Sequence, residues 1–320
     1  MPAPRILLTG ATGFVGGHIY GDLVAAGCDV ICATRDVEKA RQKDPQRQYR
    51  ALDLEDARSV REALRDVHRA VYLVHSMSDS AEYAAREAES ARTFADIAAK
   101  QGLERIVYLG GMRPRDAISK HLESRLRTGE LLRAGKVPCI ELQATMIIGG
   151  GSESFRIVRD LSARLPFMLL PKWLDSVSEP VAIADVGAAI AHALTMPLEH
   201  SDVFTLPGLE QLSGRDILLR TAKLLGNAPR VLRVPFVTPR LSSYWIRLVT
   251  RTDPHVAAEL VEGLRSDILA DGKTIWETMP DFARTSFDDA VRTALIEEER
   301  ALPEGTKLVE HALHRIAAER

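Results

Sequence analysis

The stretch Thr9-Gly10-Ala11-Thr12-Gly13-Phe14-Val15-Gly16 follows an apolar run, Arg5–Thr9, and opens a helical pattern. Its G-x-x-G-x-x-G spacing meets three physical demands. Gly10 permits a tight turn, Gly13 lets the backbone approach a pyrophosphate, and Gly16 allows close contact between helix and strand. The helix start would then offer free N–H groups and the positive end of its dipole to phosphates. A strand, a glycine-rich turn and a helix in this order predict a dinucleotide-binding site.

Apolar strands alternate with helical stretches through the first half of the chain. Further strands are predicted over Asp29–Thr34, Gln48–Leu52, Ala70–His75, Arg105–Leu109 and Val137–Gln143, and helices over Phe14–Ala26, Asp56–Val67, Ser80–Gln101 and Ser119–Ala134. This rhythm indicates an α/β fold with a doubly wound parallel sheet, covered on both faces. We predict a nucleotide-binding domain over residues 1–150, with a return segment at 181–207. Residues 151–180 and 208–320 are expected to form a smaller, mainly helical substrate domain.

The end of the second predicted strand bears on the choice of cofactor. Thr34-Arg35-Asp36 comes about 20 residues after the glycine turn, where such sites place an acid for the ribose of NAD or an arginine for the 2′-phosphate of NADP. Asp36 is explained as the N-cap of a short helix through Val37–Lys39, whereas Arg35 continues the strand toward the ligand. The pattern favours NADP(H), with NAD(H) as the alternative. The alternative to a cofactor role is that Arg35 and Asp36 form an ion pair on the surface.

Beyond the glycine turn and Thr34-Arg35-Asp36, the chain carries Asp53-Leu54, YLVHSM (Tyr72–Met77), YLGGM (Tyr108–Met112), HLESR (His121–Arg125), IIGGGSESF (Ile147–Phe155) and PVAIADV (Pro180–Val186). This combination resembles the atypical short-chain dehydrogenase/reductases, most closely their NmrA-like, NAD(P)-binding branch, over most of the chain. The resemblance implies a Rossmann fold, with Asp53 and Leu54 beside the adenine and Val74 and His75 near the nicotinamide-side ribose. The expected cofactor contacts are Gly10, Thr12, Gly13, Phe14, Gly16, Arg35, Asp53, Leu54, Val74 and His75.

The resemblance also shows where the catalytic groups should lie. The family uses a serine near the end of the fifth strand and a Tyr-x-x-x-Lys pair, whose spacing puts both side chains on one helix face. Here the serine position reads Gly110-Gly111-Met112, and the pair is best matched by His121 and Arg125. An imidazole can donate a proton near neutrality, whereas arginine stays charged and can only hold ribose hydroxyls. The alternative is that both residues merely bind cofactor or cap a surface.

Other candidates depend on position alone. Ser119, Tyr108 and Tyr83 are weaker proton donors, and Tyr108 is expected in the core because its strand is apolar. The loop from Gly149 follows the last parallel strand, at the carboxyl edge of the sheet where ligands bind. The predicted substrate pocket comprises Met112, Ser152, Ser154, Phe155 and Trp173. The alternatives are that the loop from Gly149 only connects two domains, and that Trp173 only packs in a core.

Composition excludes several classes of protein. The 320 residues carry 42 Lys and Arg against 44 Asp and Glu, a net charge of −2, so no nucleic acid partner is expected. Three cysteines without a signal sequence predict a reduced, cytoplasmic protein, and no apolar stretch reaches the ~18 residues of a membrane span. No metal site is expected. The stretch Asp288–Arg320 is interpreted as a surface helix or an oligomer contact, and the oligomeric state is left open.

Two classes of function fit these features. The first is an NADP(H)-dependent oxidoreductase that reduces a carbonyl or a conjugated double bond of a small apolar molecule. The second is a non-catalytic NADP(H)-binding regulator or assembly factor, which the missing Tyr-x-x-x-Lys pair favours. A sugar-nucleotide epimerase or dehydratase needs the same tyrosine and lysine, so the sequence disfavours it.

Overall fold

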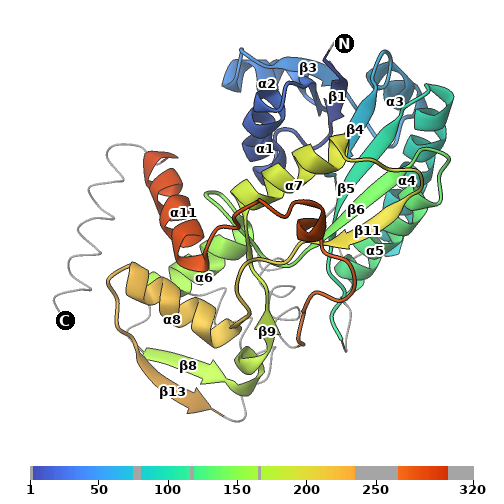
Figure 1. The fold of residues 1–320 in the computed structure, drawn as a ribbon. Helices are drawn as coiled ribbons and strands as arrows, with labels where there is room; N and C mark the ends of the chain where they lie inside the picture. Colours follow the sequence, from blue (N-terminus) through green and yellow to red (C-terminus); the bar gives the residue numbers. More distant parts are fainter. Residues whose placement is uncertain (1–2, 75–80, 116–118, 165–166, 235–265, 302–320) are drawn as a thin grey trace.

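The computed structural model of the chain describes residues 3–74, 81–115, 119–164, 167–234 and 266–301 (Figure 1). Its centre is a parallel sheet of seven strands in the order β11-β6-β5-β4-β1-β2-β3. The strands are β1 (Arg5–Leu8), β2 (Asp29–Thr34), β3 (Gln48–Ala51), β4 (Arg69–Tyr72), β5 (Arg105–Gly111), β6 (Cys139–Ala144) and β11 (Asp202–Thr205). The predicted doubly wound Rossmann fold is confirmed. Within the described ranges, no helix combines the length and apolar character that crossing a membrane requires.

Helices cover both faces of this sheet (Figure 1). One face packs against α1 (Phe14–Ala25) and α7 (Ile183–Thr195), and the other against α3 (Ala57–Ala63), α4 (Ala81–Lys100) and α5 (Lys120–Arg133). Alternate side chains of β1 point to opposite faces of the sheet. Ile6 and Leu8 therefore join the core on the α1 and α7 face, while Leu7 joins the core on the face covered by α3, α4 and α5. The continuous apolar runs seen in the sequence therefore reflect strands that are buried on both sides.

The strand order reverses between β1 and β4. The chain runs outward through β2 and β3, then returns past β1 to β4, which leaves a crevice above the carboxyl ends of β1 and β4. Two hydrogen bonds join these ends, because Thr9 N–H donates to the Val71 carbonyl at 2.9 Å and Leu73 N–H donates to Thr9 Oγ1 at 2.9 Å. The glycine turn thus begins at the topological switch point, where ligands bind in folds of this class.

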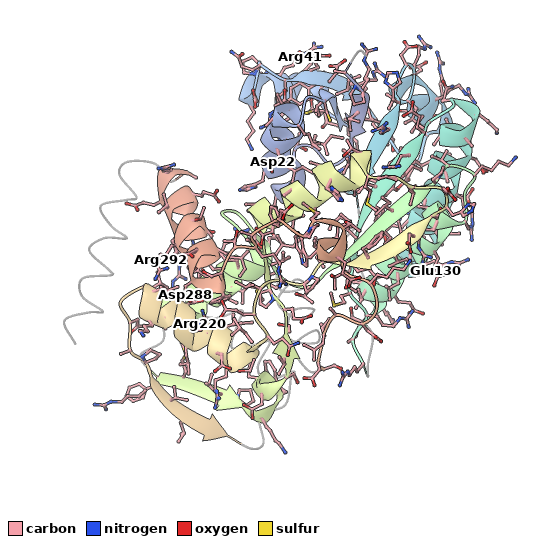
Figure 2. The ribbon with its side chains drawn as sticks, in the orientation of Figure 1. Asp22, Arg41, Glu130, Arg220, Asp288 and Arg292 are labelled. Atoms are coloured by element: carbon pink, nitrogen blue, oxygen red, sulfur yellow. The ribbon has the colours of Figure 1, made fainter. Side chains whose placement is uncertain are left out.

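A separate hydrophobic cluster, which we call the second core, lies beyond β6. It includes Phe155, Leu174, Ile217 and Val291 among its buried side chains. The elements of this part are β7 (Ile147–Ile148), α6 (Glu153–Arg164), β8 (Phe167–Pro171), the 3-10 helix η1 (Lys172–Asp175), β9 (Val177–Ser178), β10 (Val181–Ala182), β12 (Leu212–Ser213), α8 (Gly214–Leu224), β13 (Arg230–Val234) and α11 (Phe287–Ala301). The 3-10 helix η2 (Ile275–Thr278) instead packs into the core on the α1 and α7 face of the main sheet, through Ile275. An ion pair of 2.7 Å between Arg220 and Asp288 ties α8 to α11 (Figure 2).

Residues 208–320 were expected to be mainly helical, and within them Arg230–Val234 is a strand that pairs in parallel with β8. Helix α11 overlaps the stretch that was interpreted as a surface helix or an oligomer contact. Its Phe287, Ala290 and Val291 side chains are buried in the second core, so one face packs inward, while the other face carries exposed charged residues such as Arg292. The rest of the expected C-terminal helix, beyond residue 301, lies outside the described residues.

Candidate nucleotide-binding site

The glycine turn has the geometry that its sequence predicts. Gly10 has a φ of +63°, in the left-handed region that favours glycine, and its carbonyl accepts the Gly13 N–H at 3.0 Å. A Cβ on Gly16 would lie 2.4 Å from the Gly10 oxygen and 2.8 Å from Ala11 Cα. Because both of these are backbone atoms, no side-chain rotation could relieve the contact. The first turn of α1 can rest on the turn only while residue 16 is glycine.

The start of α1 offers its N–H groups to a ligand. Its N-cap residue is Gly13, no side chain caps the helix, and no acidic residue lies in its first turn. By contrast, the carboxylate of Asp36 caps α2 (Val37–Lys43) and the hydroxyl of Ser119 caps α5. Free N–H groups at a helix start favour an anion, so this turn fits the pyrophosphate of a dinucleotide.

The residues at the end of β2 divide two tasks. Asp36 Oδ1 accepts the Lys39 N–H at 2.9 Å, which confirms the predicted helix cap and commits that oxygen to the backbone. Arg35 is exposed and, among the described residues, forms no ion pair, so the surface Arg–Asp pair is not observed. The guanidinium is therefore exposed at the end of β2, and its role in cofactor binding stays a prediction.

The candidates for the adenine side lie after β3, and those for the nicotinamide-side ribose lie after β4. Asp53 Oδ1 accepts the Glu55 N–H at 3.1 Å, so this side chain shapes its own turn, while Leu54 packs partly against the core. Val74 is 36% exposed just beyond β4. A Cβ on Gly10 would lie 3.2 Å from Leu73 Cβ, which shows that the chain after β4 passes close to the glycine turn. His75 lies outside the described residues.

His121 and Arg125 lie one turn apart near the start of α5. Both side chains are half-buried, and Arg125 Nη2 donates to the Leu109 carbonyl at 3.3 Å, which holds its guanidinium at the carboxyl end of β5. A Cβ on Gly111 would lie 2.5 Å from Leu122 Cδ1, so α5 packs closely where the family's serine would stand. The structure therefore places Arg125 and the start of α5 against the carboxyl-terminal half of β5, and the catalytic role of His121 and Arg125 stays a prediction.

Tyr108 belongs to the core, as the apolar strand indicates. It is 1% exposed, its hydroxyl donates to the Arg125 carbonyl at 2.9 Å, and burial raises the pKa of Tyr108 to about 12. The bond ties the middle of β5 to α5. The helical position of the weaker candidate Tyr83 is described, but its side chain lies outside the described residues.

Sequence reasoning missed a buried carboxylate that lies between β6 and α5. Glu141 of β6 is 0% exposed, and its carboxylate lies 2.7 Å from Arg133 Nε and accepts from Gln143 Nε2 at 3.0 Å. A Cβ on Gly129 would lie 2.3 Å from Glu141 Oε2, so a glycine in the middle of α5 makes room for the carboxylate. The available signal was a charged residue inside an apolar strand together with a glycine inside a helix.

The predicted substrate-pocket residues lie in different surroundings. Met112 is buried, and its N–H donates to the Ala144 carbonyl at 3.0 Å. Ser152 Oγ donates to the Ile147 carbonyl at 2.8 Å, and Phe155 is buried in the second core. Ser154 and Trp173 are half-buried. Packing and capping account for the contacts of Phe155 and Ser152, so a shared pocket stays a prediction.

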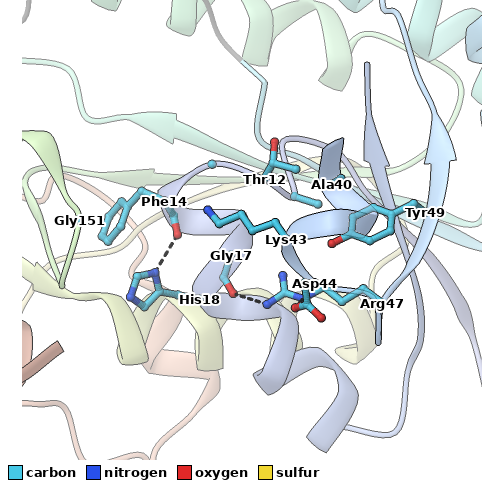
Figure 3. Close-up of a pocket in the computed structure, with 12 residues that line it drawn as sticks. Thr12, Phe14, Gly17, His18, Ala40, Lys43, Asp44, Arg47, Tyr49 and Gly151 are labelled. Carbon is cyan, nitrogen blue, oxygen red and sulfur yellow. Dashed lines mark hydrogen bonds and ion pairs between the residues drawn. The ribbon is translucent and has the colours of Figure 1, made fainter. Parts of the chain in front are cut away.

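The structure also shows a cavity that the sequence did not indicate. It has a volume of about 450 Å³ and lies between α1 and α2 (Figure 3). Arg47 borders it, paired with Asp44 at 2.6 Å and stacked over the Tyr20 ring at 4.2 Å. The lining residues are Ala11, Thr12, Gly13, Phe14, Gly17, His18, Ala40, Lys43, Asp44, Arg47, Tyr49 and Gly151. Among the described residues, no three His, Cys, Asp or Glu side chains gather in a way that could hold a metal.

Comparison with known families supports the nucleotide site directly. Residues 10–135 match the model of a family described as NAD(P)H-binding. This part of the chain is similar to NAD(P)H-binding domains. The match begins at Gly10 and extends through α5, so it contains the glycine turn, Arg35 and the His121–Arg125 pair.

Solved structures extend the likeness to nearly the whole chain. The NADP(H) complex of Citrobacter sp. triphenylmethane reductase has a TM-score of 0.70 at 18% identity, over 91% of this chain and 99% of that one. A nucleoside-diphosphate-sugar epimerase from Staphylococcus aureus has a TM-score of 0.72 at 13% identity, over 90% and 99%. UDP-glucuronic acid 4-epimerase from Bacillus cereus, with UDP-glucuronic acid and NAD, has a TM-score of 0.70 at 14% identity, over 93% and 100%. At these low identities, the structural likeness shows a shared fold and nothing beyond it. No curated protein sequence matches the chain.

Proposed function

We propose that the protein is an NADP(H)-dependent oxidoreductase of the atypical short-chain type, which reduces a carbonyl or a conjugated double bond of a small apolar molecule. The observation that carries the proposal is the start of α1, which lies at the switch point and is not capped by any side chain. The close approach of Gly16 to the Gly10 carbonyl holds the glycine turn against this helix. The likeness to a reductase crystallised with NADP(H) supports the choice of reaction and cofactor. The commitment of Asp36 to the helix cap supports NADP(H) over NAD(H).

The residues of the chain would divide the work as follows. The N–H groups after Gly13 would bind the pyrophosphate, and Arg35 would meet the 2′-phosphate as a charge-assisted pair. A bound nicotinamide supplies hydride chemistry. His121 would donate a proton to the oxygen that gains negative charge, and Arg125, which stays charged, would hold a ribose hydroxyl. Residues 1–150 with 181–207 would form the nucleotide half, and 151–180 with 208–320 the substrate half.

Two further proposals concern the setting of the protein. Cys28, Cys32 and Cys139 are buried free thiols, which supports the expected reducing, cytoplasmic compartment. The second proposal is that the whole chain belongs to the NmrA-like branch, which its sequence resembles.

Cofactor choice is tested by the variant Arg35→Ala. Losing a charge-assisted contact to the 2′-phosphate is expected to raise the Kd for NADPH by about 10- to 100-fold, with little change for NADH. Fluorescence titration of both nucleotides measures this. Lys39→Ala is the matched control, because Lys39 is an exposed cation in the first turn of α2. Equal wild-type affinities for both nucleotides, or an unchanged Kd in Arg35→Ala, would contradict the assignment.

Proton donation is tested by His121→Ala with a panel of carbonyl and enone substrates. Loss of a general acid is expected to lower turnover by about 10²- to 10⁴-fold. NADPH affinity, measured by titration, should stay close to that of the wild type. Glu123→Gln, an exposed neighbour on the same helix, serves as the control. Unchanged turnover in His121→Ala would remove that residue from the reaction.

A non-catalytic NADP(H)-binding regulator is the second candidate. It is favoured by Gly110-Gly111-Met112 at the serine position, because none of these residues carries a hydroxyl group. In that case NADPH would bind, but no compound of the carbonyl and enone panel would be reduced. The same panel therefore separates the two candidates.

A further inference from the structure

Two neighbouring glutamates near the C-terminal end of α11 contact α1, the loop after β7 and α6. Glu297 Oε2 accepts the Gly150 N–H at 2.8 Å and lies 3.4 Å from His18 Nε2 on α1. Glu298 accepts the Gly151 N–H at 3.4 Å and pairs with Arg159 of α6. These contacts join the end of α11, the loop after β7 and the flank of α1.

The geometry of the His18 ring constrains its protons. Its Nδ1 lies 2.8 Å from the Phe14 carbonyl oxygen, and its Nε2 faces the Glu297 carboxylate. A carbonyl and an ionised carboxylate can only accept hydrogen bonds, so both ring nitrogens must donate if both contacts are to be attractive. A neutral imidazole carries one N–H and can satisfy only one of them. The pair of contacts as observed therefore fits the imidazolium form.

The charges around His18 come from several elements. Asp22 lies one turn further along α1, and its pKa is raised by burial and lowered by the charge of His18. Glu297 faces the ring from α11. From α2 and the segment after it, Lys43, Asp44 and Arg47 share with His18 the wall of the 450 Å³ cavity. Arg47 and Asp44 pair with each other.

We propose that His18 and Glu297 form a pH-sensitive latch, which holds the last turn of α11 and the Gly150–Gly151 loop against α1 when His18 is protonated. Histidine is the side chain that ordinarily changes charge between pH 5 and 8. The neutral ring keeps one N–H, and the shorter contact, 2.8 Å to the Phe14 carbonyl against 3.4 Å to Glu297, holds that proton on Nδ1. Nε2 then presents a lone pair to the Glu297 carboxylate, and the contact becomes repulsive. His18 and Gly151 both line the cavity beside the glycine turn, so opening the latch would change one wall of it. The latch goes beyond the proposed function and does not depend on it.

Hydrogen exchange in the full chain, without nucleotide, tests the latch. The readout is the protection factor of amides 296–301, which follow the last buried residue of α11, Ala294. Both side chains are partly exposed, so the effect is modest: protection at pH 6 is expected to exceed that at pH 8 by about two- to fivefold. Protection in β5 is the internal reference for global opening.

Variants assign the pH dependence to the latch. His18→Gln keeps a donor near Glu297 but cannot titrate, so the ratio between pH 6 and pH 8 should fall to about one. Glu297→Gln should have the same effect. The control is His192→Gln, because His192 contacts Thr278 of η2 rather than α11. A flat wild-type ratio, or a ratio that persists in His18→Gln, would overturn the latch. Because nucleotide is absent, its failure is distinct from any failure to bind NADPH.

Discussion

Gly16→Ala is expected to abolish measurable NADPH binding and to lower the free energy of unfolding by about 3 kcal/mol. The added methyl would lie 2.4 Å from the Gly10 oxygen and 2.8 Å from Ala11 Cα, so either the turn or the first turn of α1 must move. Either displacement moves the N–H groups that would bind the pyrophosphate. Fluorescence titration with NADPH and urea unfolding followed by circular dichroism measure the two effects.

The neighbouring glycine supplies a matched control for this prediction. A Cβ on Gly17 has no atom within 4 Å, so Gly17→Ala adds the same methyl group to the same helix without a clash. Because alanine favours helix over glycine by about 1 kcal/mol, Gly17→Ala should be slightly more stable than the wild type. If Gly16→Ala binds NADPH as Gly17→Ala does, the close-contact account of the glycine turn is wrong.

Glu141→Ala is expected to lower the free energy of unfolding by about 2–4 kcal/mol. Breaking a fully buried ion pair costs about 3–5 kcal/mol. The loss expected here is smaller than that range, because the Arg133 side chain is 29% exposed and can turn to water. The change also leaves Gln143 without its carboxylate acceptor and opens a cavity between β6 and α5. Urea unfolding measures the loss.

Gly129 provides a sharper test through a double-mutant cycle. In the wild type, Gly129→Ala should destabilise the protein, because its Cβ would lie 2.3 Å from Glu141 Oε2. In the Glu141→Ala background the same methyl group partly fills the vacated space, so it should be neutral or stabilising. Additive effects of the two changes would show that the carboxylate does not occupy the space opposite Gly129.

The sheet could be predicted because its strands are buried on both faces and therefore read as continuous apolar runs. Errors at the strand ends have local causes. Strand β4 was expected to continue to His75 but ends at Tyr72, because the next amide, Leu73 N–H, donates to the side chain of Thr9 instead of to a neighbouring strand. A hydrogen bond between segments that are far apart in sequence leaves no periodic signal.

The second core shows the limit more clearly. Strands β7, β9 and β12 have two residues each, too short for an alternating pattern to appear. Phe155 was expected to line a pocket because its loop follows the sheet. Its ring is buried in a core whose members also come from β8, α8 and α11, and that core could not be read from the loop alone. The cofactor turn was predictable because its residues are contiguous, whereas Glu141 and Gly129 gain meaning only from their contact.

The seventh strand has a consequence for how the protein is synthesised. Strand β11 pairs with β6, although its residues follow β6 by way of α6 and several elements of the second core. While a nascent chain has only its first 150 residues outside the ribosome, the outer edge of β6 is bare, and Ile140 and Leu142 lack the cover of α7. Unpaired strand edges invite association with other chains. A gene fragment that stops after residue 150 should therefore yield aggregates, whereas one that extends through Thr205 completes the sheet.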